Sequence, residues 1–384
     1  IVTNTIAQGD TREGGLAEIV RRGGAIVGAT RRVPWPGDAG VVVSLVWVSR
    51  GAAPTRPLLD GRPVACIDPL LSSYGRLADP KRLAGNAGRA FIGCFLRGKG
   101  FVFDDASSGA SPVSVMRAAL AKNPAGAEVV LPFLGGEEVL SHPEQKPHRW
   151  VIHFGARPLE EVRARFPELL AIVERRVRPF REARRETKAD VAHAAAWWRF
   201  ANTRPELESK KRGLARVIVM PRMTSNVVAA FLPAGYVPSD QLVVVASESP
   251  AVLAVLSSRV HATWTRLLAS TLGDGLRYTP TDVFETFPFP CGGFAALEGH
   301  RRLRRVGARF HEQRARCLLE LGVGLTSLLA LAREEHPSAA VARFVRVQAE
   351  LDRAVLDAYG WADLADLVDA PFDDAVLPRL FAAN

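Results

Sequence analysis

The first fifty residues alternate between apolar runs and polar turns, as in a sheet crossed by a helix. The β-branched run Ile1–Ile6 predicts a buried strand, and a short helix with an apolar stripe follows it as far as Gly23 and Gly24. Further apolar runs over 25–30 and 41–49 predict two more strands. Strand, helix, strand and strand form the tail of an α/β sheet, so we expect the chain to be the C-terminal piece of something longer.

A segment rich in Gly, Ala, Pro and Thr over 51–60 predicts a linker or domain boundary. Beyond it, short strands alternate with loops, and a strongly helical stretch occupies 158–212. The other predicted strands cover 90–95, 100–103, 128–133, 150–154, 216–220, 227–232 and 241–246. The other predicted helices cover 112–122, 249–270, 294–335 and 337–359.

The net charge of the chain indicates what class of partner it binds. The chain has 384 residues, 50 Lys and Arg against 40 Asp and Glu, and a net charge of +10, which favours an anionic partner such as nucleic acid. Thirteen basic residues against six acidic ones lie between Glu174 and Arg216. Arg181, Arg185 and Lys188 in this stretch are candidate phosphate contacts. The alternative is a solvated amphipathic helix face with internal ion pairs.

Two polar loops carry side chains suited to reading DNA. Arg222, Thr224, Ser225 and Asn226 follow a predicted strand, and Arg277 and Tyr278 follow a Gly-Asp-Gly turn. Arg can bond guanine bidentately and Asn can bond adenine. An ordinary capping turn is an equally good reading of the first loop.

The aromatic cluster Trp197, Trp198 and Phe200 could stack on a displaced base. We favour a core position for these rings, since one or two of them would anchor the helix to the sheet.

The sequence lacks the motifs that indicate several kinds of site. The four cysteines contain no CxxC pair, which suggests neither a zinc site nor a disulfide framework and fits a reducing cytoplasm. No apolar run approaches the length of about 18 residues that spans a bilayer, so no membrane partner is expected. G-x-G-x-x-G, P-loop and Asn/Asp-Pro-Pro-aromatic motifs are absent. We therefore expect no catalytic, cofactor-binding or metal-binding residue in this chain.

Seven stretches in order along the chain resemble the C-terminal half of the MmeI-like family of S-adenosylmethionine-dependent, adenine-specific DNA methyltransferases, which includes fused restriction-modification enzymes. The stretches are VTNTIAQG (2–9), PWPGDA (34–39), PFLGG (132–136) leading to Arg149–Trp150, WWxF (197–200), PRxTS (221–225), LRYTPTDxFxxFPFP (276–290) and LDxAVxxAYGW (351–361). Their order and spacing cover nearly the whole chain.

The resemblance implies a fold of α/β plus α+β class. Residues 1–52 would be the C-terminal remnant of a Rossmann-like methyltransferase sheet, 53–291 a mixed α/β target recognition domain, and 292–384 a helical C-terminal domain. The cofactor loop and catalytic tetrad of the family precede the point where this chain begins. This fragment alone is therefore expected to be inactive and to bind no cofactor.

By the same resemblance, the intact enzyme would use S-adenosylmethionine to methylate N6 of a flipped adenine. The partners of this chain would be double-stranded DNA and the upstream catalytic half of the same enzyme. One alternative is a standalone DNA-binding specificity subunit that acts with a separate catalytic chain. Another is an α/β protein whose positive charge is incidental.

Overall fold

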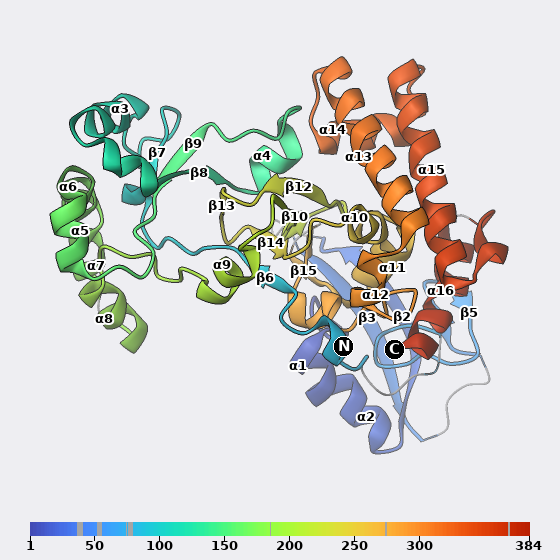
Figure 1. The fold of residues 1–384 in the computed structure, drawn as a ribbon. Coiled ribbons are helices and arrows are strands. Elements are labelled where there is room, and N and C mark those ends of the chain that lie inside the picture. Colours follow the sequence, from blue (N-terminus) through green and yellow to red (C-terminus); the bar gives the residue numbers. More distant parts are fainter. Residues whose placement is uncertain are drawn as a thin grey trace.

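The computed structural model describes residues 1–36, 41–51, 56–73, 75, 80–184, 186–272, 275–367 and 369–384. The fold is a mixture of several small sheets and helices, with a helical C-terminal part. Figure 1 shows an N-terminal sheet at the bottom, a lobe at the left, long helices at the upper right and a central sheet where these parts meet.

The N-terminal sheet has the strand order β1-β3-β2-β4-β5. Its strands are β1 (Val2–Thr3), β2 (Gly24–Pro34), β3 (Val42–Arg50), β4 (Leu58–Leu59) and β5 (Arg62–Pro63). Strand β3 pairs antiparallel with both β1 and β2, so β1 and β2 run in the same direction. The connection between them is helical: α1 (Gly9–Arg12), the π-helix η1 (Glu13–Ala17) and α2 (Glu18–Arg21).

This sheet differs from the predicted one in two respects. The strand expected over Ile1–Ile6 has only two residues, because Ile6 turns into a small core with Leu16 and Ile26. The sheet also continues past the boundary predicted at residue 52: β4 pairs parallel with β2, and Leu59 and Leu71 belong to the same core. Burial of these leucines accounts for the return of the chain to the sheet.

The central sheet is antiparallel, with the order β12-β10-β14-β6. Its strands are β6 (Ala90–Ile92), β10 (Arg216–Pro221), β12 (Ala230–Pro233) and β14 (Leu242–Val245). All four residues of β14 are buried, which fits the continuous apolar run that predicted it. Helix α10 (Pro250–Leu256) belongs to the same core, and every residue from Ala251 to Leu256 has no exposed surface.

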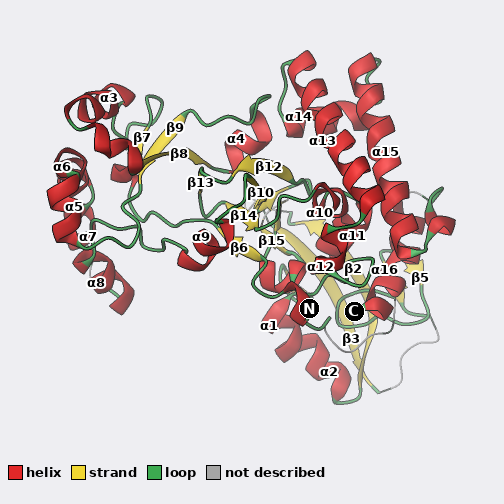
Figure 2. Ribbon diagram, in the orientation of Figure 1, coloured by secondary structure: helices red, strands yellow, loops and turns green. Residues whose placement is uncertain are grey.

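The left lobe has its own sheet, β13-β8-β9-β7, and its own core around Phe103, Phe154 and Phe166. The strands are β7 (Val102–Phe103), β8 (Val130–Leu134), β9 (Arg149–Ile152) and β13 (Val237–Pro238), flanked by η3 (Lys99–Phe101), α3 (Val113–Lys122), η4 (Pro124–Glu128) and α4 (Gly136–Ser141). Helices α5 to α8 cover its outer side in Figures 1 and 2.

The helical stretch predicted over 158–212 is confirmed, but it is divided. Its helices are α5 (Leu159–Arg165), α6 (Pro167–Arg176), α7 (Arg178–Glu182), α8 (Lys188–Ala195) and α9 (Pro205–Lys211). Three of them have a proline in their first turn, where the missing N–H costs no hydrogen bond but where the preceding helix must end.

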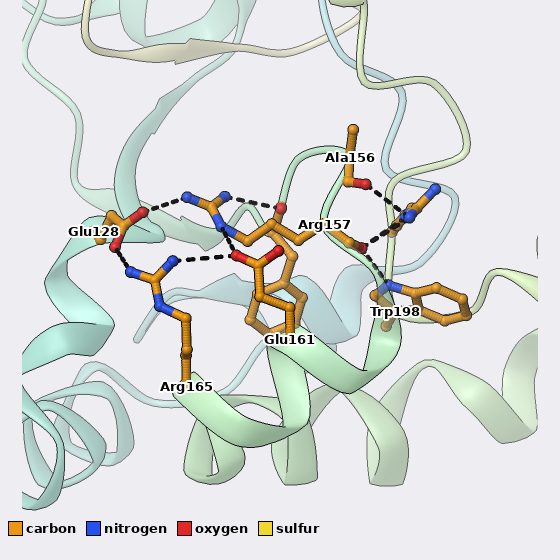
Figure 3. Close-up of polar contacts among 8 residues, drawn as sticks. Glu128, Ala156, Arg157, Glu161, Arg165 and Trp198 are labelled. Atoms are coloured by element: carbon orange, nitrogen blue, oxygen red, sulfur yellow. Dashed lines mark hydrogen bonds and ion pairs between the residues drawn. The ribbon is translucent and has the colours of Figure 1, made fainter.

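A polar network fastens α5 to the turn before β8 (Figure 3). Glu128 forms ion pairs with Arg157 and Arg165, and both arginines also reach Glu161, at 3.4 and 3.1 Å. The indole Nε1 of Trp198 donates to the carbonyl oxygen of Arg157 at 3.1 Å. These two guanidinium groups therefore have acidic partners within the protein.

The C-terminal part packs on α10 without a break in the core, which runs across the boundary predicted at residues 291 and 292. Its helices are α12 (Phe294–Glu298), α13 (Arg301–Leu321), α14 (Leu325–Arg333), α15 (Ala339–Tyr359) and α16 (Asp369–Ala383), with the short 3-10 helix η6 (Ala362–Leu364). Three further helical segments precede it in the sequence: the 3-10 helix η2 (Ala84–Asn86), helix α11 (Arg259–Leu268) and the π-helix η5 (Pro280–Phe284). Polar caps divide the longer predicted helices: Ser258 accepts from His261 N–H to start α11, and His300 accepts from Leu303 N–H to start α13.

Among the described residues, no single helix has the length and apolar character to cross a membrane. The pair α13 and α14 meets those criteria only together, and it bends by 90°. The described residues contain no group of three metal-ligating side chains close enough to hold an ion.

Gly307 permits a close contact between two core helices, α10 and α13. A Cβ atom built at this position of α13 would lie 1.9 Å from the carbonyl oxygen of Pro250 in α10. We expect Gly307→Ala to lower the free energy of unfolding by about 1 to 3 kcal/mol, since the helices would have to separate. Urea unfolding measures the change. Gly14→Ala is the control, because a Cβ there meets no atom within 4 Å, and an equal loss in both variants would contradict the packing argument.

Asp352 gives the core a pH-dependent contribution. Its carboxylate accepts from the Arg259 N–H at 2.8 Å, yet burial raises the pKa to about 6 from an ordinary value of 3.8. Because the folded pKa is the higher one, the folded protein binds this proton more tightly than the unfolded chain does. The stabilisation is therefore complete below about pH 4 and is lost as the pH rises through 6, an amount of about 3 kcal/mol.

We expect Asp352→Asn to flatten the dependence of unfolding free energy on pH between about pH 4 and 7. Urea unfolding of both proteins at several pH values measures the difference, which isolates this carboxyl from the other acidic groups. Parallel pH profiles for wild type and variant would contradict the prediction.

Candidate nucleic-acid interface

A small ribbon places the two predicted DNA-reading loops side by side. It has the order β11-β16-β15, with β11 (Met223–Thr224), β15 (Ser270–Leu272) and β16 (Gly275–Arg277). Met223 pairs with Arg277, and Tyr278 N–H donates to the carbonyl oxygen of Arg222 at 2.8 Å. The backbones of Arg222 and Arg277 are therefore neighbours, although 55 positions separate them in the sequence. Residues 273–274, which join β15 to β16, lie outside the described residues.

Arg222 is half-buried beside the central sheet. Its Nη1 donates to the carbonyl oxygen of Asp240 at 2.9 Å, but its Nε is buried and has no hydrogen-bond partner among the described residues. Burial, and after it the nearby charge of Arg277, lowers the pKa of this guanidinium group. Arg277 itself is exposed, and no described side chain forms an ion pair with it. Two adjacent cations, one of them exposed, form a site for acceptor atoms.

The rest of the first loop is more constrained. Thr224 Oγ1 accepts from Asn226 N–H at 3.0 Å and donates to its carbonyl oxygen at 2.7 Å, which folds the loop back on itself. The Asn226 carboxamide oxygen accepts from the guanidinium of Arg333 in α14. Ser225 between them is exposed. Asn226 thus ties the loop to the C-terminal helices, while Ser225 faces solvent.

Tyr278 does not present its ring to a ligand in this structure. The side chain is 2% exposed, and its hydroxyl lies 3.1 Å from Nε2 of His261, whose pKa burial lowers to about 3. The structure therefore places Tyr278 in the core and not at the surface of the ribbon, and a DNA contact at this position stays an untested prediction. The residue after Arg277 instead packs in the core and fixes the end of β16, because an aromatic ring with a satisfied hydroxyl is stable there.

Arg181 is also misplaced as a phosphate contact. It is 2% exposed, and its guanidinium donates only to main-chain carbonyl oxygens in two neighbouring segments. The acceptors are those of Leu96, Arg97, His193, Ala196 and Arg199, at 2.6 to 3.3 Å. Burial lowers its pKa to about 10, so the group stays charged at neutral pH. The charge serves to join segments of the left lobe.

The remaining basic candidates lie elsewhere. Lys188 is exposed at the first position of α8, and Arg185 falls outside the described residues. Figure 1 places α8 at the outer end of the left lobe, away from β15 in the centre. The structure thus brings Arg222 and Arg277 together but separates them from Lys188.

The expectation that Trp197 and Phe200 pack in the core is confirmed, with exposures of 5% and 6%. Trp198 is partly buried against the same lobe.

A cavity of about 600 Å³ lies beside Arg222, between the left lobe and the central sheet. Asp240 and Gln241 line it from the turn before β14, and Lys99 lines it from the start of η3. Gln241 is also tied to the interface, because its carbonyl oxygen accepts from Arg222 N–H at 2.8 Å. The sequence carries no signal for this site, since Lys99 lies 141 positions before Asp240 and the two segments meet only through the tertiary fold.

A family of known proteins matches the part of the chain that contains the ribbon. Residues 113–291 match the family model described as "MmeI, target recognition domain". This range includes the ribbon, the central strands β10, β12 and β14, and most of the left lobe. No curated protein matches the sequence.

Among solved structures, the chain is similar to one titled "Structure of Type IIL restriction-modification enzyme MmeI in complex with DNA has implications for engineering of new specificities". The TM-score is 0.69 at 18% identity, and the match covers 100% of this chain and 48% of that chain. The chain therefore spans about half the length of the protein that it matches. The resemblance to the MmeI-like family is confirmed: the chain contains a stretch that matches the MmeI target recognition domain and shares its fold with part of MmeI.

Proposed function

We propose that this chain is the DNA sequence recognition part of a site-specific, S-adenosylmethionine-dependent adenine-N6 methyltransferase of the restriction-modification type. The observation that carries the proposal is the pair Arg222 and Arg277, which lies within the residues that match a target recognition domain. The Arg222 guanidinium group is half-buried, with Nη1 bonded to the carbonyl oxygen of Asp240, and Arg277 is exposed. Guanine offers two acceptors, O6 and N7, to such groups in the major groove.

The proposed interface has two parts, one that reads base edges and one that contacts phosphate. Arg222 and Arg277, with exposed Ser225 and Gln241 beside them, would read base edges. Lys188 on the outer lobe would contact phosphate, which fixes the position of the duplex without reading its sequence. We propose the same phosphate contact for Arg185.

The N-terminal sheet supports a place for a catalytic partner. Two strands of the same direction, joined by a helical segment, are the repeating unit of an α/β sheet, and β1 and β2 have this relation. We propose that these strands are the remnant of a Rossmann-like methyltransferase sheet. The catalytic half, with the cofactor and the adenine-binding tetrad, would complete it.

A standalone specificity subunit that acts with a separate catalytic chain is the second candidate. The topology of β1 and β2 favours the fused arrangement, because an independent recognition subunit has no need of a partial sheet. An upstream reading frame that encodes a glycine-rich loop and the tetrad would support the first candidate. A reading frame that starts near Gly51 would support the second.

Arg277→Ala and Lys188→Ala should have different effects on DNA binding. We expect Arg277→Ala to relax the preference at one base pair by about 1 to 3 kcal/mol, and Lys188→Ala to weaken all sequences equally and reduce the salt slope by about one. Selection from a randomised duplex library, followed by titration at several salt concentrations, measures both. Lys122→Ala in α3, at the other end of the left lobe, is the matched control. Uniform weakening by Arg277→Ala would reassign that residue to phosphate.

We propose that S-adenosylmethionine contacts the catalytic half and no residue of this chain, which has no glycine-rich G-x-G-x-x-G loop. Titration calorimetry of the purified chain should therefore show no binding heat for this cofactor. Micromolar affinity would contradict the assignment of the cofactor site to the other half.

A further inference from the structure

We propose that Lys99 donates to a base edge of the DNA, and that Arg181 and Asp190 are positioning residues that hold the segment 95–99 from which Lys99 projects. The proposal deepens the proposed function and rests on it, since it adds a reader to the same interface. It also gives α8, which carries the proposed phosphate contact Lys188, a second role in the interface.

Lys99 is an exposed cation that lines the cavity beside Arg222. It lines the cavity together with Asp240, whose carbonyl oxygen accepts from Arg222. The Lys99 stem runs over Gly109, where a Cβ atom would come within 2.7 Å of Lys99 Cδ. No described carboxylate forms an ion pair with its amino group. The stem is thus guided by packing, while the amino group remains available.

The charges around the cavity favour a base edge over a phosphate. Asp104, Glu137 and Asp240 line the same cavity as Arg97, Arg149 and Lys99. The two arginines already have acidic partners, since Arg97 pairs with Asp190 and Arg149 pairs with the buried Glu138 at 2.5 Å. Three carboxylates would repel a phosphate. Base edges carry both donors and acceptors, and a lysine beside carboxylates and a glutamine matches such a mixed pattern. Guanine, with O6 and N7, is the base whose edge suits Lys99.

Helices α7 and α8 both contact the segment 95–99, which carries Lys99. Arg181 in α7 donates to the carbonyl oxygens of Leu96 and Arg97, at 2.6 and 3.1 Å. Asp190 in α8 forms an ion pair with the Arg97 guanidinium. Arg97 has φ of +47°, a left-handed conformation that a residue with a side chain adopts only when its surroundings impose it. Arg181 and Asp190 supply that constraint two residues before Lys99.

The geometry of Arg181 is specific to arginine. Its donors reach carbonyl oxygens on both sides, those of residues 96 and 97 and those of 193, 196 and 199 at the end of α8. A lysine has a single nitrogen with three donors and cannot span both segments. Arg181→Lys therefore keeps the charge but releases one of the segments.

The first experiment compares Lys99→Ala with wild type in the full 384-residue chain, using selection from a randomised duplex library and titration in salt. We expect the preference for guanine at one position to fall about tenfold or more, with an unchanged salt slope. Lys188→Ala is the contrasting variant. Equal weakening of all sequences with a smaller salt slope would assign Lys99 to phosphate and overturn base reading.

The second experiment tests positioning with a double-mutant cycle. Arg181→Lys should reduce the same base preference, and Lys99→Ala should cause little further loss in that background, because both changes remove one interaction. Additive losses would overturn the positioning role. Asp190→Asn provides a second route to the same segment if Arg181→Lys folds poorly, and a thermal melt of each variant establishes that the folded protein is compared.

The experiments distinguish failure of the proposed recognition function from failure of the inference about Lys99. If the wild-type chain selects no sequence from the library, the proposed recognition function fails. If wild type selects a sequence and Lys99→Ala selects the same one with the same discrimination, only the inference about Lys99 fails.

Discussion

The burial of helix α10 is the constraint on which the rest of the structure depends. A helix that is apolar on all sides is stable only when it is surrounded, and Ala251 to Leu256 have no exposed surface at all. The central sheet and helix α13 share one core with it, and the contact at Gly307 brings the backbones together. Because α10 leads through α11 into β15, the ribbon that carries Arg277 follows directly on a fully buried part of the core. The proposed reading residues thus project from loops whose ends are fixed in the core.

Buried arginines show why net charge alone is a poor guide to a binding surface. Arg181 and Arg314 are 2% and 3% exposed, and the hydrogen bonds described for both guanidinium groups go to main-chain carbonyl oxygens. A carbonyl at the end of a helix or strand has no other donor to satisfy it, so an arginine can stabilise several chain segments at once. Part of the excess of 10 positive charges therefore stabilises the fold. Exposure, which the sequence does not reveal, decides which cations remain for DNA.

The local elements were predictable, whereas their assembly was not. Apolar runs predicted β10 and β14, and helical spacing predicted α3 and α15, because burial imposes a period on each of these segments. The ribbon pairs Met223 with Arg277, and the same cavity is lined by Lys99 and Asp240. The members of each pair are far apart in the sequence, and local hydrophobic periodicity carries no information about such long-range contacts. Tyr278 shows the same limit at one residue. Its type suits a DNA contact, but the position of His261 on α11 places the ring in the core.

The separation of fixed and exposed residues has a consequence for recognition. Arg277, Ser225, Gln241 and Lys99 are exposed, and none of them belongs to the three apolar cores. A substitution at such a position changes hydrogen bonding to a ligand but removes no packed core volume, so its effect on folding is small. Tyr278 and Arg181, each close to a proposed reader, are buried and costly to change. On the proposed function, base preference can therefore vary through the exposed residues while their buried neighbours preserve the geometry in which any such residue meets the DNA.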